Sequence, residues 1–287
     1  MLPLAVTATR FLENIMEKIY PRLHVLLARE SNKAIIIRRG PSKQTCVIGW
    51  DRGTDEFRIG QWFKGIIYHH RSDISPDGKH WIYFAFHFRY GQTWTVVAKT
   101  PYLKAVDFYL KRSAWHGGGI FLKNDTYWLN DGGGSYIRQE KGKELKVKES
   151  DVLDQAVDGE SVGIYTYKLI RDGWEKINTV KSEKHRRKIY FHKQLDKELI
   201  LCKIFYATSN HPPGKGCYFE RHEMIDAKNE KKWEFPDWEW ADYDNGHLIW
   251  AEHGKILRGD VDENGLKDVK ELFDTNPLTF EKIKAPY

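Results

Sequence analysis

Short stretches of alternating apolar and polar residues, broken by turns, run along most of the chain. Near the N-terminus, four such stretches are rich in β-branched and aromatic side chains: Leu23–Arg29, Lys33–Arg38, Gln44–Trp50 and Glu56–Trp62. Polar residues that favour turns separate them. Because this composition suits a pleated, half-buried surface better than a helix, the pattern predicts short antiparallel strands.

One unit of this pattern recurs along the chain. A turn at Ser75–Gly78 precedes the aromatic stretch Trp81–Phe88, and the segment Ala241–Ala251 has the same form near the other end. Pro76 presets φ for such a turn, and Gly78 accepts a positive φ. Central strands are expected near residues 36, 84, 128, 202 and 250. A period of about 45 to 50 residues made only of strands predicts a β-propeller.

The motif Ser-Pro-Asp-Gly-Lys at residues 75–79, followed by an aromatic strand, resembles the repeat of TolB-like and WD40-like propellers. The resemblance is clear over this motif and extends to the rest of the chain only as a pattern. No repeat of this chain combines the Gly-His and Trp-Asp pairs that typify WD40 repeats. The resemblance therefore implies an architecture, and it implies no activity, because propellers host many functions.

We expect an all-β, single-domain propeller, with five blades of four antiparallel strands and six blades as the alternative. Residues 1–20 are expected to form an N-terminal extension, and residues 21–287 the propeller, with an insertion at about 131–160. Within that insertion, Ser150 is a candidate helix cap for one or two turns at 150–157. The stretch Val162–Ile170 is expected to be a strand. A last strand at Phe280–Lys284 would join the first blade and close the ring.

Composition adds little about activity. The 287 residues carry a net charge of +6, but Trp233–Tyr287 alone carries 13 acidic and 6 basic residues. The excess of positive charge therefore lies in the rest of the chain, where an anionic ligand or nucleic acid could bind. The basic run 181–188 lacks interleaved aromatic residues, so we expect a solvated loop and no nucleic acid.

Three cysteines, Cys46, Cys202 and Cys217, are too few and too irregular for a disulfide framework or a zinc site. We expect buried free thiols, no metal and no cofactor. The first residues lack the charge and the continuous apolar run of a secretory signal, and no long apolar run exists. With a mean hydropathy of −0.63, a soluble, cytoplasmic, monomeric protein without membrane contact is expected.

Two polar clusters are candidates for a metal site and for a catalytic loop. In a strand, His69, Arg71 and Asp73 would share one face and could hold a metal, but an Asp beside a tight turn is explained by bonds to backbone amides. The run His116–Gly119 resembles an oxyanion loop, but no Gly-x-Ser-x-Gly accompanies it. Close backbone approach near the channel explains these glycines better.

Five-bladed propellers include glycoside hydrolases, which need two carboxyl groups near the axis. Four aspartates near expected inner turns are candidates: Asp51, Asp73, Asp125 and Asp242. Nearby tryptophans could stack on sugar rings: Trp50, Trp81, Trp128 and Trp240. The fold alone would also place Asp in turns and Trp between blades, so this carbohydrate-active enzyme stays the alternative.

The main expectation is a non-catalytic scaffold that recognises a protein partner through loops on one propeller face. The segment Trp233–Trp240 could be a blade edge, or it could display an aromatic patch of the kind that anchors partners. Loops that enter innermost strands should gather around the channel. We therefore expect a partner-binding or ligand-binding cluster of six residues: Arg71, Asp73, Trp115, His116, Trp240 and Asp242.

Overall fold

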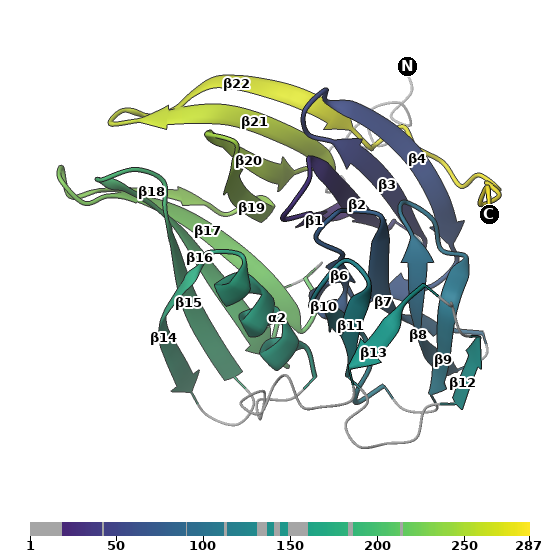
Figure 1. Cartoon of the computed structure of the whole chain (residues 1–287). Helices are drawn as coiled ribbons and strands as arrows, with labels where there is room; N and C mark the ends of the chain where they lie inside the picture. Colours follow the sequence, from purple (N-terminus) through teal and green to yellow (C-terminus); the bar gives the residue numbers. More distant parts are fainter. Residues whose placement is uncertain are drawn as a thin grey trace, which may run out of the picture.

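The computed structural model describes residues 19–41, 43–89, 91–111, 114–130, 137–140, 144–148, 160–182, 186–212 and 215–287. These residues are nearly all in strands, and the strands form five sheets. Figure 1 shows the sheets placed around a common centre in the order of the chain. The all-β class and the propeller-like arrangement predicted from the strand pattern are confirmed. In the described part of the chain, no helix is long and apolar enough to cross a membrane.

The first and last sheets are antiparallel meanders of four strands. In the first sheet, strands pair in the order β1 (Arg22–Leu27), β2 (Lys33–Arg39), β3 (Thr45–Asp51) and β4 (Glu56–Phe63). The last sheet follows the same order with β19 (Trp238–Asp244), β20 (His247–Glu252), β21 (Lys255–Asp262) and β22 (Gly265–Asp274). All four N-terminal strands predicted from β-branched runs are present.

The second sheet is larger. It contains β5 (Ile66–Ile67), β6 (Asp73–Ile74), β7 (His80–His87), β8 (Gln92–Lys99), β9 (Ala105–Lys111) and β12 (Ile137–Glu140). A 3₁₀ turn, η1 (His69–Arg71), separates β5 from β6. Trp81, Ile82 and Phe84 on β7 are fully buried, as the aromatic pattern predicts.

The third sheet has three strands: β10 (Gly119–Phe121), β11 (Thr126–Leu129) and β13 (Lys146–Lys148). The pairing of β11 with β13 is parallel. The expected regular four-stranded third blade is therefore wrong, because β12 joins the second sheet instead. Most of the expected insertion, including Ser150 and the helical turns at 150–157, lies outside the described residues.

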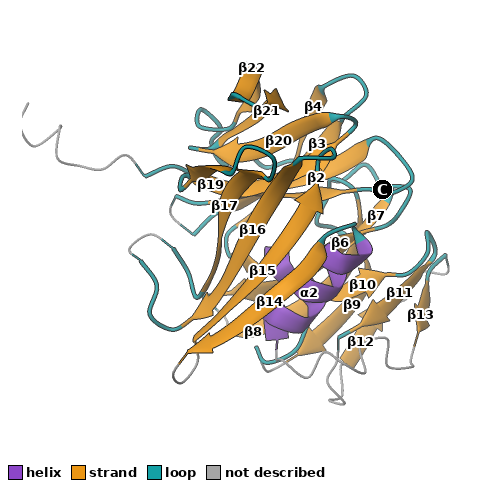
Figure 2. Cartoon of the chain, turned by 90° about the vertical axis from the view of Figure 1, so that its left-hand side faces the viewer, coloured by secondary structure: helices purple, strands orange, loops and turns teal. Residues whose placement is uncertain are grey.

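The helix α2 (Glu160–Arg171) precedes the fourth sheet, which contains β14 (Glu175–Ser182), β15 (Arg186–Gln194), β16 (Leu199–Thr208), β17 (Tyr218–Asp226) and β18 (Lys231–Phe235). Figure 2 shows α2 behind the strands of this sheet. Val162, Tyr165 and Leu169 bury one side of the helix in a cluster with side chains of the fourth and fifth sheets.

The strand expected at Val162–Ile170 is thus wrong. Val162, Tyr165 and Leu169 are spaced three and four residues apart, which is the spacing of one face of a helix. The β-branched and aromatic residues of this stretch favoured a strand, and the packing of its apolar face overrode that local preference. Gly173, with φ of +87°, follows the end of the helix, where a left-handed residue is common.

The C-terminal segment Phe280–Lys284 forms no strand, so that expectation is also wrong. It lies along the first sheet through side-chain contacts: the ring of Phe280 is 5.9 Å from that of Trp62, and Gln61 Nε2 donates to Ile283 O at 2.8 Å. Anchoring by side chains holds the segment in place without a backbone ladder.

The inner elements follow one another around the centre. β1 contacts β19 and β6, β6 contacts β10, and α2 contacts both η1 and β10. These inner elements, together with the facing strands of the fourth sheet, surround the cavity described next.

Candidate functional site

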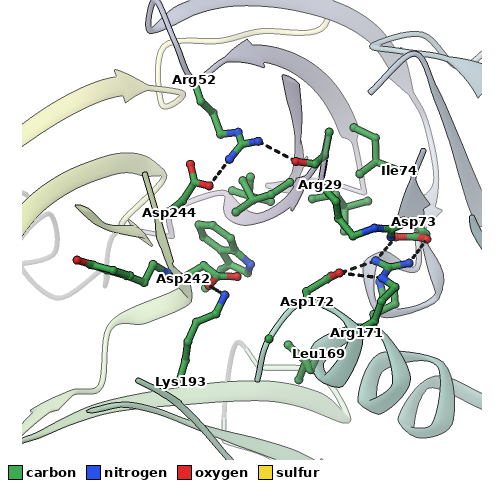
Figure 3. A pocket seen from close by; sticks show the side chains of 18 of the residues that line it. Arg29, Arg52, Asp73, Ile74, Leu169, Arg171, Asp172, Lys193, Asp242 and Asp244 are labelled. Carbon is green, nitrogen blue, oxygen red and sulfur yellow. Dashed lines mark hydrogen bonds and ion pairs between the residues drawn. The ribbon is translucent and has the colours of Figure 1, made fainter. Parts of the chain in front are cut away.

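A central cavity of about 730 Å³ lies among the inner elements. Its wall combines side chains from β1, β6, α2, β15, β16 and β19 with the turn after β3 (Figure 3). Eleven of its lining residues are basic or acidic: Arg29, Glu30, Arg52, Asp73, Lys168, Arg171, Asp172, Lys193, Lys203, Asp242 and Asp244. The size fits a small molecule.

Arg171 lies between two carboxylates. Its Nη1 and Nη2 donate to Asp73 at 2.7 and 2.9 Å, and its Nε and Nη2 donate to Asp172 at 2.7 and 3.0 Å. Asp73 also accepts the Phe121 amide at 2.8 Å. Figure 3 shows this clamp at one side of the cavity, where the end of α2 meets β6.

The two carboxylates of the clamp have opposite pKa shifts. Burial alone would raise the pKa of Asp73, but Arg171, which donates two bonds to it, holds that pKa below its usual value. Burial raises the pKa of Asp172, although Arg171 partly offsets the effect. Neighbouring carboxyl groups whose pKa values are pushed apart are a common feature of sites that transfer protons.

Asp242 lies on the opposite side of the cavity. It accepts from Lys193 Nζ at 2.5 Å and from the Tyr243 amide at 2.8 Å, and Trp174 Nε1 donates to its second oxygen at 3.4 Å. Nearby, Arg52 forms an ion pair with Asp244 and donates to Ala28 O at 2.8 Å. Each of these cavity carboxylates therefore keeps a positive partner beside it.

Two cavity cations have no such partner. Lys168 Nζ donates to the carbonyls of Ser72 and His69, and Arg29 Nη2 donates to Phe121 O at 3.4 Å. No carboxylate of the described residues forms an ion pair with either of them. Burial lowers the pKa of Lys168 to about 8, with Asp73 and Asp172 opposing the shift.

A second buried charge network lies beside the cavity and centres on Glu220. Its carboxylate is 3.0 Å from Lys203 Nζ, 3.3 Å from His222 Nε2 and 3.6 Å from His70 Nε2, and Tyr165 donates to it. Burial would raise the pKa of Glu220, but Lys203 and the two histidines keep it well below its usual value. The network therefore favours the ionised form of a carboxylate in the interior.

A smaller cavity of about 230 Å³ lies on the other side of His24, which lines both cavities. Its wall includes His69, His70, Cys217 and Glu239. Burial raises the pKa of Glu239 to about 7, and its carboxylate accepts a hydrogen bond from the Leu23 amide at 2.7 Å.

The three cysteines differ in burial. Cys217 is exposed, so the expectation of three buried thiols is wrong for this residue; Cys46 and Cys202 are buried as expected.

The six residues expected to form one cluster lie in three different places. Asp73, Trp240 and Asp242 line the central cavity. Arg71 is buried beside it, donating to Ser161 Oγ at 3.1 Å and to Ala114 O at 2.8 Å. Trp115 and His116 do not line either cavity, and Trp115 is 71% exposed. A binding role for any of the six stays a prediction.

Other local expectations can be compared with the structure. His69 and Arg71 lie in the 3₁₀ turn η1, so the shared strand face expected for His69, Arg71 and Asp73 is wrong. Asp73 does not cap the following turn; Asp77 does, by accepting from Ser75 Oγ and the Lys79 amide. The segment Trp233–Trp240 begins in β18, the edge strand of the fourth sheet, which agrees with the expected blade edge. The alternative of an aromatic patch is wrong, because Trp238 and Trp240 are 2% and 3% exposed.

The glycines after His116 do mark close backbone approach. A Cβ on Gly118 would lie 2.0 Å from Arg71 O, and one on Gly117 would lie 2.1 Å from the ring of Phe84.

Among the aspartates considered for glycoside hydrolysis, Asp73 and Asp242 line the central cavity. Asp51 pairs with Lys33 and Asp125 with Lys146, and neither aspartate lines that cavity.

Sequence reasoning missed the residues that α2 and the fourth sheet contribute. Lys168 lies in the stretch Val162–Ile170 that was expected to be a strand, and Arg171 and Asp172 directly follow it. The spacing of Val162, Tyr165 and Leu169 is that of one face of a helix. In a helix, Lys168 and Asp172 would lie about one turn apart and on the same side. Nothing in the sequence pattern marks Glu220 as a buried charge.

No protein-family model matches the chain, and no curated protein sequence is significantly similar to it. Comparison with solved structures finds the β-propeller domain of the trilobed protease from Pyrococcus furiosus, with 11% identity and a TM-score of 0.35, covering 90% of this chain and 100% of that one. Hydrazine synthase from Kuenenia stuttgartiensis matches with 11% identity and a TM-score of 0.28, covering 86% and 78%.

An uncharacterized protein from Listeria monocytogenes EGD-e matches with 12% identity and a TM-score of 0.31, covering 86% of this chain and 69% of that one. Such distant likenesses carry no argument about activity. The functional argument therefore rests on the cavities of this chain alone.

Proposed function

We propose that the central cavity binds a small hydroxylated molecule of the carbohydrate class. The observation that carries this proposal is the alternation of donors and acceptors around the wall. The Arg171 clamp and the Lys193–Asp242 and Arg52–Asp244 pairs each place a cationic donor beside an anionic acceptor. A hydroxyl group both donates and accepts, so vicinal hydroxyls match such pairs better than a purely anionic or apolar ligand does.

Three aromatic residues also line the cavity, Tyr165, Trp240 and Tyr243. An aromatic side chain offers an apolar surface on which the C–H groups of a sugar ring can pack. The remaining donors, Lys168 and Arg29, would bind a hydroxyl or a carboxylate of the ligand. The presence of these two cations without a carboxylate partner favours a sugar acid over a neutral sugar, because the ligand would supply the missing carboxylate.

The test is a binding screen of the full chain by isothermal titration calorimetry against neutral sugars, sugar acids and simple dicarboxylates. Lys168→Met and Lys193→Met are each expected to weaken binding of the best sugar by at least about 10-fold, since each removes a charged donor. Lys255→Met is the control, because Lys255 pairs with Glu271 on the exposed part of the last sheet. Binding only of dicarboxylates, or equal affinity in all three variants, would refute the carbohydrate proposal.

Hydrolysis of a glycosidic bond is the second candidate, and the opposite pKa shifts of Asp73 and Asp172 favour it. Asp172 would be the proton donor and Asp73 the ionised partner. Turnover of nitrophenyl glycosides that Asp172→Asn abolishes, with sugar binding retained, would support this candidate. Binding without turnover leaves the protein a lectin-like receptor.

The scaffold for a protein partner, expected from the sequence, remains a separate proposal that rests on the exposed Trp115. Loss of a captured partner in Trp115→Ala, with sugar binding unchanged, would support it.

We also propose that the five sheets are five blades of a closed ring. The contact between β1 and β19 supports closure, as does the bond from the Leu23 amide to Glu239 Oε2 at 2.7 Å.

A further inference from the structure

We infer that His24, His69 and His70 form a binding site for a divalent transition metal ion, separate from the proposed carbohydrate cavity. One ligand nitrogen from each ring lies within 4.8 Å of those of the other two. Three histidines are the ligand set of many catalytic zinc sites, in which water fills the fourth position.

The three histidines come from two sheets that fold together. His24 is on β1, and His69 and His70 are consecutive in the turn η1. The ring centroids of His24 and His69 are 4.5 Å apart, and those of His69 and His70 are 4.0 Å apart. Because a tetrahedral ion with bonds of about 2.0 to 2.1 Å needs nitrogens about 3.4 Å apart, small rotations of the rings suffice to bind it.

The surroundings of His70 match those of a metal ligand. Glu220 Oε1 lies 3.6 Å from its Nε2, in the position that a carboxylate takes behind a metal-ligating histidine, and Nδ1 would then bind the metal. A carboxylate behind a ligating histidine also raises the basicity of the ligand.

The site is also accessible. All three histidines line the cavity of about 230 Å³, which the exposed Cys217 also lines. That cavity leaves room for water or a small ligand at the open coordination position. His24 additionally lines the central cavity, so a metal here would lie between the two cavities.

One residue opposes metal binding. Arg39 Nη1 lies 3.0 Å from His69 Nδ1, and the guanidinium can only donate in this contact. The proton of neutral His69 is then on Nε2, so a metal must either take Nδ1 from Arg39 or displace that proton. Arg39 therefore competes with the metal, and its removal should strengthen binding.

The experiment uses the full chain after dialysis against a chelator, with cobalt(II) as the spectroscopic probe and zinc(II) in calorimetry. The wild type is expected to bind one equivalent of either ion, with visible absorption typical of a four-coordinate cobalt site. His24→Gln and His70→Gln should each weaken binding by about 100-fold or more, and Arg39→Gln should strengthen it by about 10-fold.

Two control variants locate the ion. Cys217→Ser tests the exposed thiol of the same cavity, and His253→Gln tests the exposed group formed by Asp237, Glu252 and His253. Both should bind cobalt with wild-type affinity. Circular dichroism would show whether each variant is folded. The titration of the wild type tests the inference independently of the folding of any variant. Failure of the wild type to bind a stoichiometric ion, or loss of binding in either control but not in His24→Gln, would overturn the inference.

Discussion

Arg171, the last residue of the only α-helix in the described part of the chain, donates to both carboxylate oxygens of Asp73, which lies 98 positions earlier on β6. Asp73 is 1% exposed. The pair therefore fixes the C-terminal end of α2 against the second sheet and forms part of the cavity wall at the same time. Stability and binding are expected to depend on the same contact.

Replacing Asp73 should therefore cost stability. Asp73→Ala is expected to lower the free energy of unfolding by about 3 kcal/mol, since it leaves a largely buried guanidinium with Asp172 as its one remaining carboxylate. Asp55→Ala is the matched control, because Asp55 makes the same two-bond contact with Arg258 in a more exposed place. The control should lose no more than about 1 kcal/mol in urea denaturation. Equal losses would mean that burial of the pair has no effect.

Glu239 should make stability depend on pH. Its pKa in the folded protein is raised to about 7, above the usual 4.5, so the folded state holds a proton that the unfolded state releases. Its contribution to stability is full below pH 4.5 and is lost as the pH rises to about 7, a change of about 2 to 3 kcal/mol. Glu239→Gln should remove this part of the pH dependence.

The measurement is urea denaturation of wild type and Glu239→Gln at pH 4.5, 6 and 8. The variant should gain stability relative to the wild type as the pH rises. Glu271→Gln on the exposed part of the last sheet is the control and should show no such trend. A difference between wild type and Glu239→Gln that is constant across pH would contradict the prediction.

Gly118 should be intolerant of a side chain. Its φ is +78°, and an added Cβ would lie 2.0 Å from Arg71 O, so Gly118→Ala is expected to cost about 3 kcal/mol or more. Gly246 has a similar φ of +83° but nothing within 4 Å of the added atom. Gly246→Ala should therefore cost only about 1 kcal/mol. Thermal unfolding of both variants separates the effect of backbone strain from that of the clash.

Thiol chemistry should distinguish the three cysteines. Cys217 is exposed, whereas burial raises the pKa of Cys46 and of Cys202 to about 12. A disulfide reagent at pH 8 is expected to modify one thiol of the native protein quickly and three after denaturation. The fast phase should be absent in Cys217→Ser. Two fast thiols in the native wild type would contradict the burial of Cys46 or Cys202.

Most strands and their approximate spacing could be predicted from local sequence. The β-branched runs of the first sheet and the Ser75–Gly78 turn before β7 are local features: alternation, β propensity and turn chemistry act over a few residues and can be read directly. The close approach at Gly117 and Gly118 could also be predicted, because adjacent glycines in a polar loop indicate a crowded backbone.

The helix α2 and the composition of the site depend on contacts between residues that are distant in the chain. The stretch Val162–Ile170 has strand-like composition, and it becomes a helix because Tyr165 and Leu169 bury one face against distant strands. This helix brings Lys168 and Arg171 to the central cavity. His24 and His70 meet only because β1 and η1 pack together. Such contacts join residues far apart in the chain, and no local pattern encodes which of them will be neighbours.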